Sequence, residues 1–237
     1  MDEKTALQTA QKILKQVFQF PEYHKRIEEL KLERIEEKFS FDIPKPEERI
    51  CALSGKKTYA FFADEKVASL KAIAEEFQKT GWIRKKRSLN SMDDILKAWE
   101  EIKIYTAEKQ INSLNIAKSD GIYNSRNIYK SISIFDSRDI IFCYKIFNSA
   151  FMLASRDNSS CSFGVRISES INCSNCFEVS WSNKVSNSLF IHDSYDLYEC
   201  LFCSHLKSKK YCIANMQFEK EEYFRLKRMV VEWVLNK

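Results

Sequence analysis

Four cysteines are spaced as two Cys-x-x-Cys pairs, an arrangement by which many proteins hold zinc. Cys173 and Cys176 form the first pair, Cys200 and Cys203 form the second, and 23 residues separate the pairs. Zinc ligation would place all four sulfurs about 2.3 Å from one ion. The same cysteines also fall in a six-residue repeat, whose other copies carry Ser, Val or Leu at these positions. The repeat favours packing inside the protein without metal, and a zinc site is the alternative.

The repeat occupies residues 121–205. Ser or Cys recurs at every sixth position from Ser125 to Cys161 without exception. A second, apolar series, from Ile122 to Met152, stands three residues before each of the first six of these positions. From Ser170 onward the two series exchange occupants, because small residues stand where Ile stood and apolar residues stand where Ser stood. The volume per repeat is roughly kept, as close packing inside a narrow tube requires.

A period of six does not match the 3.6-residue turn of an α-helix. Hairpins are disfavoured because Gly121 and Gly164 are the only glycines of the region and it lacks proline. Short strands stacked into a β-solenoid satisfy the pattern, with residues such as Asn127 and Asp139 at the corners. Alternation along a strand predicts that Tyr123 and Ser125 share a face. The number of hexads per coil and the direction of the Ile slot stay open.

The segments before and after the repeat are predicted to be mostly helical. Thr5 is a candidate cap for a first helix, Ser54-Gly55 is a candidate hairpin turn, and amphipathic helices are expected over 67–77, 92–104 and 219–235. The predicted class is therefore α+β. The predicted domains are a mostly α-helical domain over 1–118 with a small β-hairpin near 50–62, a six-residue-repeat β-solenoid over 119–206, and a C-terminal helix over 207–237 that caps the last coil.

Two basic clusters are candidates for nucleic-acid contact, because positive charge beside an aromatic ring suits phosphates and bases. The alternative is a pair of solvated, lysine-rich segments. The sharper cluster consists of Trp82, Arg84, Lys85, Lys86 and Arg87, and the second of Lys207, Lys209, Lys210, Arg225, Lys227 and Arg228.

An apolar series in the second slot of the hexads is a candidate protein interface. Its members are Tyr123, Tyr129, Phe135, Ile141 and Phe147. A narrow tube that already holds Ile and Ser has little room for a third series of bulky side chains. Part of the series should therefore face outward, where either the chain's own helices or a partner would cover it.

The string from Tyr211 to Tyr223, YCIANMQFEKEEY, resembles the closing motif of an uncharacterised repeat family found in candidate-phyla bacteria and in phages. In that family, Cys/Ser hexads precede a motif like Y-C-I-x-N-x-Q-[FY]-x-K-E-E-Y. The stretch Cys51-Ala-Leu-Ser54-Gly55-Lys56 is similar to the family's C-x-x-[CT]-G-K. The resemblance implies a repeat fold and, from its phage members, a virion component. The zinc-finger-like Cys pairs at the front of many relatives are missing from this chain.

Enzymatic chemistry finds few candidates. The hexads lack the glycines typical of acyltransferase solenoids, and His192 and His205 have no carboxylate at a suggestive spacing to orient them. A net charge of +5 and the lack of a long apolar run or secretory signal predict a cytoplasmic protein without a membrane partner.

The sequence predicts a non-enzymatic scaffold that docks into a larger complex, such as a phage virion, through a protein partner or self-association. No cofactor is predicted. The alternative is a nucleic-acid-binding or ribosome-associated module, and an acyltransferase-like enzyme is the third reading.

Overall fold

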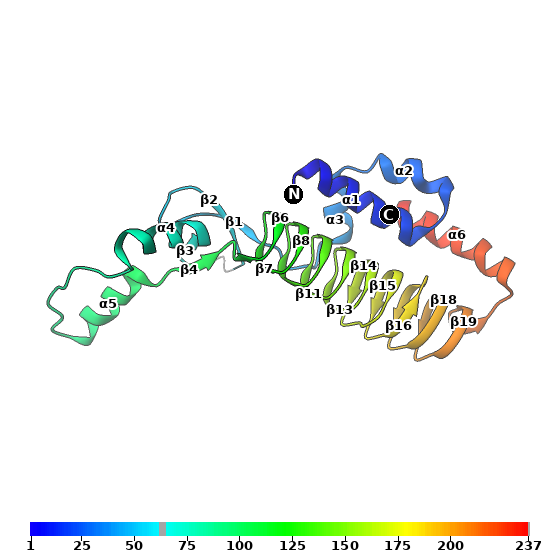
Figure 1. Cartoon of the computed structure of the whole chain (residues 1–237). Helices are drawn as coiled ribbons and strands as arrows, with labels where there is room; N and C mark the ends of the chain where they lie inside the picture. Colours follow the sequence, from blue (N-terminus) through cyan, green and yellow to red (C-terminus); the bar gives the residue numbers. More distant parts are fainter. Residues whose placement is uncertain (62–64, 237) are drawn as a thin grey trace.

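The computed structural model describes residues 1–61 and 65–236 of the chain (Figure 1). Its helices are α1 (Glu3–Phe18), the 3-10 helix η1 (Pro21–Tyr23), α2 (His24–Glu28), α3 (Leu32–Phe39), α4 (Leu70–Thr80), α5 (Met92–Ile102) and α6 (Lys220–Asn236). Outside the solenoid lie β1 (Glu47–Ile50), β2 (Lys57–Ala60), β3 (Val67–Ser69) and β4 (Tyr105–Ala107).

The first half of the solenoid contains β5 (Gln110–Ile111), β6 (Leu114–Ala117), β7 (Asp120–Tyr123), β8 (Arg126–Tyr129), β9 (Ile132–Phe135), β10 (Arg138–Ile141), β11 (Tyr144–Phe147) and β12 (Ala150–Leu153). The second half contains β13 (Arg156–Ser159), β14 (Ser162–Ser168), β15 (Ser174–Ser180), β16 (Asn183–Ser186), β17 (Leu189–His192), β18 (Tyr195–Ser204) and β19 (Lys207–Ile213), and β20 (Met216–Gln217) follows it.

The predicted β-solenoid is confirmed, and one coil of it contains two hexads. Paired residues of neighbouring parallel strands are 12 apart in the sequence, as in the pairing of Arg126 with Arg138 and of Ile128 with Ile140. The solenoid has about nine turns over residues 110–213. It therefore extends beyond the predicted range of 119–206 at both ends.

The backbone repeats every three residues rather than every six. Every third residue from Asn112 to Ala214 has a positive φ, so each coil turns at four left-handed corners. Ile122 and Ser125, three residues apart, both point inward and are buried, and Tyr123 points outward. The prediction that Tyr123 and Ser125 share a face is therefore wrong. Strand alternation requires a continuous extended chain, and here a left-handed residue rotates the chain after every two extended ones.

The small inward residues are also hydrogen-bonding residues. The Ser125 hydroxyl donates to the Tyr123 carbonyl at 2.7 Å and accepts from the backbone N–H of Ser137, one coil further on, at 3.1 Å. The same pair of bonds recurs at Ser137, whose hydroxyl receives the N–H of Ser149 at 3.0 Å. A buried backbone N–H without a hydrogen-bond partner costs free energy. The inward positions with small residues therefore favour Ser and, less strongly, Cys, because their side chains accept the N–H of the next coil.

The exchange of large and small residues takes place in a single coil, residues 155–166. Asn158 enters the lumen there, and its amide bonds the Ile167 carbonyl at 2.7 Å. Gly164 lies in the same coil, where an added Cβ would come within 2.6 Å of Met152 and 2.7 Å of Ile167. The glycine is required because large residues from the coils before and after it meet at that point.

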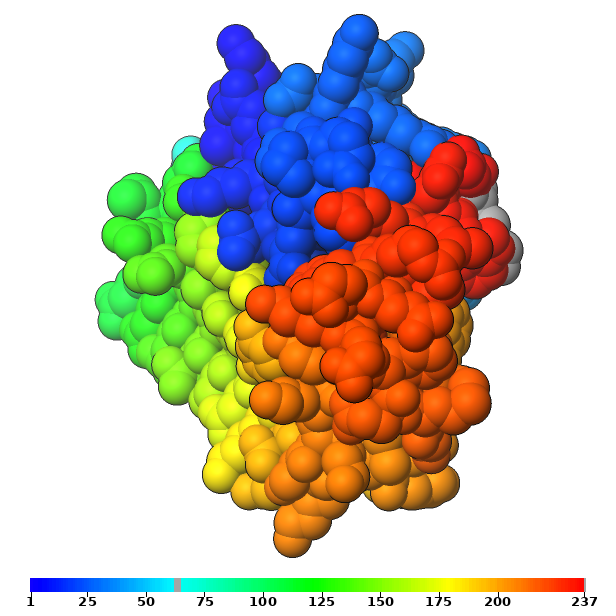
Figure 2. Space-filling model, turned by 90° about the vertical axis from the view of Figure 1, so that its right-hand side faces the viewer, coloured from blue at the N-terminus to red at the C-terminus, as the bar shows by residue number. Residues whose placement is uncertain are grey.

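One face of the solenoid is covered by helices α1, α3 and α6 (Figure 1). A row of outward apolar residues at 12-residue intervals packs under them, and we call it the covered row: Tyr129, Ile141, Leu153, Val165, Phe177, Leu189 and Leu201. Viewed from the far end, α6 (red) lies beside the N-terminal helices (blue) on the same side of the coils (Figure 2). The predicted C-terminal helix is thus confirmed as α6, and it runs back from the last coils along the covered face. Its predicted range of 207–237 is too long, because residues 207–213 form β19 of the solenoid.

The remaining elements form a lobe that projects from the first coils (Figure 1). The predicted hairpin is present as the antiparallel pair β1–β2, around the turn that contains Gly55. The helix expected from Val67 begins three residues later, after Ser69, whose hydroxyl caps it, because Val67 pairs with Tyr105 in a short parallel sheet. At the N-terminus, Asp2 caps α1 in place of Thr5 by accepting the Thr5 N–H at 2.7 Å.

Candidate interaction surfaces

The four paired cysteines occupy inward slots of the solenoid and are buried. Cys176 and Cys200 are 24 residues apart, so they lie in the same slot two coils apart, a separation of about 10 Å at the usual strand spacing. One zinc ion cannot contact both pairs at that separation. In the described part of the chain, no group of three or more His, Cys, Asp or Glu side chains is placed to hold a metal ion.

The lumen cysteines act as serine equivalents. The Cys176 thiol donates to the Ser174 carbonyl at 3.1 Å, the contact that serine makes in the other coils. Burial raises the pKa of Cys143 and of Cys176 to about 12, so both are protonated thiols at neutral pH. As protonated thiols in a closed lumen, these two cysteines are neither nucleophiles nor metal ligands.

The two histidines considered for catalysis lie on the outside of the last coils. Contrary to expectation, a carboxylate does orient one of them, because His205 Nδ1 lies 3.0 Å from Asp193 Oδ2. The pair was missed because the two residues are 12 apart, one coil length. His192 Nδ1 lies 2.9 Å from the Ser180 hydroxyl in the same manner. Both members of the His205–Asp193 pair are exposed, a setting that offers no water-excluded site for general-base catalysis.

The predicted aromatic series is divided between opposite faces of the coil. Tyr129 belongs to the covered row, is buried and contacts Glu3 of α1 through its hydroxyl at 3.1 Å. Its assignment as an interface for an outside partner is therefore wrong, because the chain's own helix occupies that face. Tyr123, Phe135 and Phe147 stack in parallel on the opposite face, with ring centroids 4.8 and 5.0 Å apart. We call this face, at 12-residue intervals, the bare row: Tyr123, Phe135, Phe147, Ser159, Ile171, Asn183 and Tyr195.

The basic cluster of residues 82–87 forms the loop between α4 and α5. Arg84 and Arg87 both form ion pairs with Glu101 of α5, the second at 2.9 Å. Lys85 and Lys86 are exposed and have no ion pair within the described residues. The loop therefore contributes a smaller positive surface than its sequence indicates.

The second basic cluster does not form a common surface. Lys227 is buried, and Arg228 pairs with Glu22 at 3.1 Å. Lys207, Lys209 and Lys210 lie on β19, where only Cys212 and Ile213 pair with β20. Lys209 occupies a position of the last coil at which residues of the other coils point inward, and it is exposed. Lysines along a strand edge, and a charge in an inward slot, block further strand pairing.

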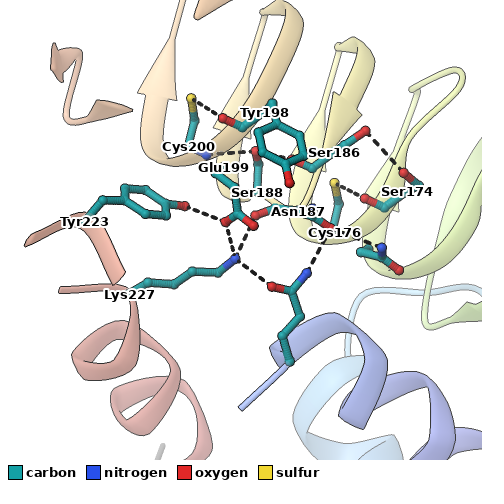
Figure 3. Close-up of polar contacts among 12 residues, drawn as sticks. Ser174, Cys176, Ser186, Asn187, Ser188, Tyr198, Glu199, Cys200, Tyr223 and Lys227 are labelled. Atoms are coloured by element: carbon teal, nitrogen blue, oxygen red, sulfur yellow. Dashed lines mark hydrogen bonds and ion pairs between the residues drawn. The ribbon is translucent and has the colours of Figure 1, made fainter. Parts of the chain in front are cut away.

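Lys227 belongs to a buried polar cluster that joins α6 to the solenoid (Figure 3). Its ammonium donates to Glu199 Oε2 at 2.5 Å, to the Asn187 carbonyl at 2.9 Å and to Oε1 of Gln19, the residue after α1, at 3.2 Å. The Tyr223 hydroxyl also donates to Glu199 Oε2, at 3.2 Å. Burial lowers the pKa of Lys227, and the attraction of Glu199 opposes that shift. All three ammonium hydrogens have acceptors, so the cluster fixes the helices and leaves no group available to a ligand.

The exposed apolar face of α5 was not predicted from the sequence. This 11-residue helix has no buried residue. Its apolar side chains stand at helical spacing on one side and are all exposed, and we call them the α5 stripe: Met92, Ile95, Leu96, Trp99 and Ile102. The signal was present in the sequence as an amphipathic pattern, but the pattern alone does not reveal that the lobe leaves its apolar face uncovered.

Comparison with protein-family models, with curated proteins and with solved structures finds no match for this chain. Among the described residues, none of the helices combines the length and apolar character needed to span a membrane.

Proposed function

We propose that this protein is a non-enzymatic scaffold that docks into a larger complex by inserting the α5 stripe into an apolar groove of a protein partner. The observation that carries the proposal is an amphipathic helix without a buried residue, whose five large apolar side chains are each 44% exposed or more. Exposed apolar residues scattered singly are ordinary, but five on adjacent turns form a contiguous patch of the kind that marks interaction sites.

The length of α5 supports an external partner. Isolated helices shorter than about 12–15 residues are marginally stable in water, and most helices are stabilised by packing of their apolar face. α5 is held by its Ser91 cap and by the ion pairs of Glu101, both at its polar side or ends. A groove that receives Ile95, Trp99 and Ile102 would supply the missing packing, in the manner of helix-in-groove recognition.

The charge around the stripe defines the partner further. Lys85 and Lys86 stand in the loop before α5 without an acidic neighbour in an ion pair among the described residues. A partner groove bordered by carboxylates would pair with them, and complementary charge increases the rate and specificity of association. The solenoid then serves as a rigid body that holds the lobe at one end, with the bare row as a second surface.

The alternative function is nucleic-acid binding through the same loop, which Trp82 and the two unpaired lysines favour. The ion pairs that occupy Arg84 and Arg87 weaken that alternative. A place in a phage virion and a cytoplasmic location stay predictions from the sequence.

A photo-crosslinking residue at position 96, in the full chain expressed in its own cells, tests the proposal. The crosslinked protein is identified, purified and titrated against the parent chain and against Trp99→Asp. We expect Trp99→Asp to weaken binding at least 30-fold. Trp181→Asp is the matched control, since Trp181 is 61% exposed on a solenoid corner and Trp99 is 53% exposed. The control should bind within twofold of the parent.

Two outcomes would overturn the proposal. One is crosslinking at position 96 that does not exceed crosslinking at position 181, and the other is equal binding by Trp99→Asp and the parent. Binding of RNA or DNA that falls steeply with salt, and that is lost in Lys85→Glu/Lys86→Glu but kept in Trp99→Asp, would establish the alternative function.

A further inference from the structure

A pocket of about 440 Å³ opens between α3, the solenoid and α6, far from the α5 stripe. Its volume lies within the range of small-molecule sites. The aromatic residues that line it come from all three elements and the segment after α3: Phe39, Phe41, Phe177, Phe190 and Trp233. Phe177 meets Phe39 edge-to-face at 6.0 Å and meets Phe190 edge-to-face at 5.2 Å. A ring that entered the pocket would therefore find both ring edges and ring faces to pack against.

The positively charged residues of the pocket differ in whether a carboxylate pairs with them. Arg166 is held by Asp42 at 2.6 Å and by Glu178, so its charge is compensated on two sides. Arg34 lies 3.5 Å from Glu37. Lys38 has no ion-pair partner in the described part of the chain. Its pKa is lowered by burial and by the positive charges of Arg34 and Arg26, so the ammonium lies in a locally positive environment.

We propose that this pocket binds an aromatic monocarboxylate, with the ring among the phenylalanines and the carboxylate on Lys38. An apolar ligand without charge would leave the half-buried Lys38 ammonium without a counter-charge, and a carboxylate relieves that cost. A polyanion does not fit, because a single cation of the pocket lacks a carboxylate partner. The carboxylate comes from a free small molecule or from an aromatic residue at the end of a peptide chain, and these sources share the same chemistry.

Indole-3-propionate and its neutral amide are the probes that separate charge from ring packing. In titration calorimetry with the full chain, we expect the acid to bind at least tenfold more tightly than the amide. Lys38→Gln should abolish that preference. The control is Lys12→Gln. Lys12 lies over the Phe151 ring at 4.5 Å, as Lys38 lies over the Phe39 ring at 5.6 Å, but Lys12 is outside the pocket. The control should keep the preference for the acid.

A second variant distinguishes loss of binding from loss of folding. Phe41 is 71% exposed and lines the rim of the pocket, so Phe41→Ala should keep the parental melting temperature while it weakens binding of the acid at least threefold. Equal affinity for acid and amide in the parent, or no binding of the acid at 5 mM (a probe concentration of the order of the weakest specific affinities), would overturn the proposal.

A pentapeptide that ends in Trp, compared with its C-terminal amide, distinguishes the two sources. Binding of the peptide acid as tightly as indole-3-propionate supports recognition of a chain end, and binding of the small acid alone supports a free ligand. None of these measurements depends on the α5 stripe, so their failure and the failure of the proposed docking function are separate results.

Discussion

Opposite faces of the same solenoid obey one backbone rule and carry different side chains. The covered row is apolar along its whole length and is buried under helices. The bare row begins with stacked aromatics and becomes mixed from Ser159 onward, and Phe147 in it is 44% exposed. The backbone hydrogen bonds of the two faces are equivalent. The inward residues and the corner residues therefore determine the coil. The type of residue at each outward position depends on what covers that face.

The corners show the same contrast more sharply. Large aromatic residues in the left-handed region lie beside the covered face, and they are Phe142, Phe151, Phe163, Phe190, Phe202 and Tyr211. Corners on the bare side carry Asn, Asp, Ser, Lys and similar residues, with Trp181 as the exception. A bulky residue in this conformation costs on the order of 1–2 kcal/mol. Packing of the ring against the helix layer offsets that cost at every one of these corners except Phe202, which is 44% exposed and stacks on Phe190. A solvent-facing corner offers no such gain.

The largest expected difference between the faces follows from a buried charge. Leu153→Asp places a carboxylate under α1 with no partner and should lower the free energy of unfolding by about 4 kcal/mol or more. Phe147→Asp on the bare row should change it by less than about 1 kcal/mol, because the new charge stays hydrated. Urea denaturation followed by circular dichroism measures both values. Equal losses would show that the bare row is packed as tightly as the covered row.

The buried ion pair of the helix layer gives the next effect. Lys227→Met leaves Glu199 buried without its counter-charge and should lower the free energy of unfolding by about 3–5 kcal/mol. Lys227→Met combined with Glu199→Gln should recover at least half of that loss, because neither remaining group is charged. Arg126→Met is the matched change at an exposed position of the solenoid, where it should have an effect below about 0.5 kcal/mol. A double variant as unstable as Lys227→Met would contradict this account.

The lumen is common to both faces, so changes there should not depend on what covers the coil. Ser149→Leu overfills a small slot and also removes the acceptor for the N–H of Cys161, 3.1 Å away. Val185→Ser removes buried apolar surface. Each should lower the free energy of unfolding by about 1–3 kcal/mol. Unchanged melting temperatures in both variants would mean that these side chains do not point inward.

The smallest effect concerns pH. Burial alone would raise the pKa of Glu36 of α3, but the ion pairs with Lys130 and Lys45, at 2.6 and 3.1 Å, outweigh it and hold that pKa below its usual value. A carboxylate with a lowered pKa contributes stability above its unfolded pKa of about 4.3, and that stability is lost as the pH falls through the folded value. Glu36→Gln should therefore flatten the fall in stability below pH 5 (about the upper end of this range). A steeper fall in the variant would reverse the assigned direction.

The fold was largely predictable because the lumen repeats without gaps. The exchange of Ile and Ser predicted a constant internal volume, and both series do point inward. The coil length was not found, because the two hexads of a coil have the same inward residues. They differ in the residues that face outward, among which Leu153 and Val165 continue an apolar row at 12-residue intervals while Phe147 is followed by Ser159. Recognition of the 12-residue interval in the sequence would have placed Tyr129 and Tyr123 on opposite faces of the coil.

The candidate surfaces were less predictable because they depend on contacts between distant segments. Lys227 reads as a surface cation in the sequence, and only the approach of Glu199 and Gln19 explains its burial. Likewise, the amphipathic pattern of α5 predicts a helix that packs on a core, and the lobe provides none for it. Local pattern determines the element, but the element's neighbours determine whether its apolar face is buried.

The 12-residue register also limits how such a protein can change in length during evolution. A duplication or deletion of 12 residues adds or removes one whole coil, about 4.8 Å of the rod, and keeps each row on its own face. A change of six residues would leave the lumen intact but would turn every later outward residue by half a coil. Phe177 and Leu189 would then face solvent, and Asn183 would lie under a helix. Viable descendants of this chain should therefore differ in length by whole coils.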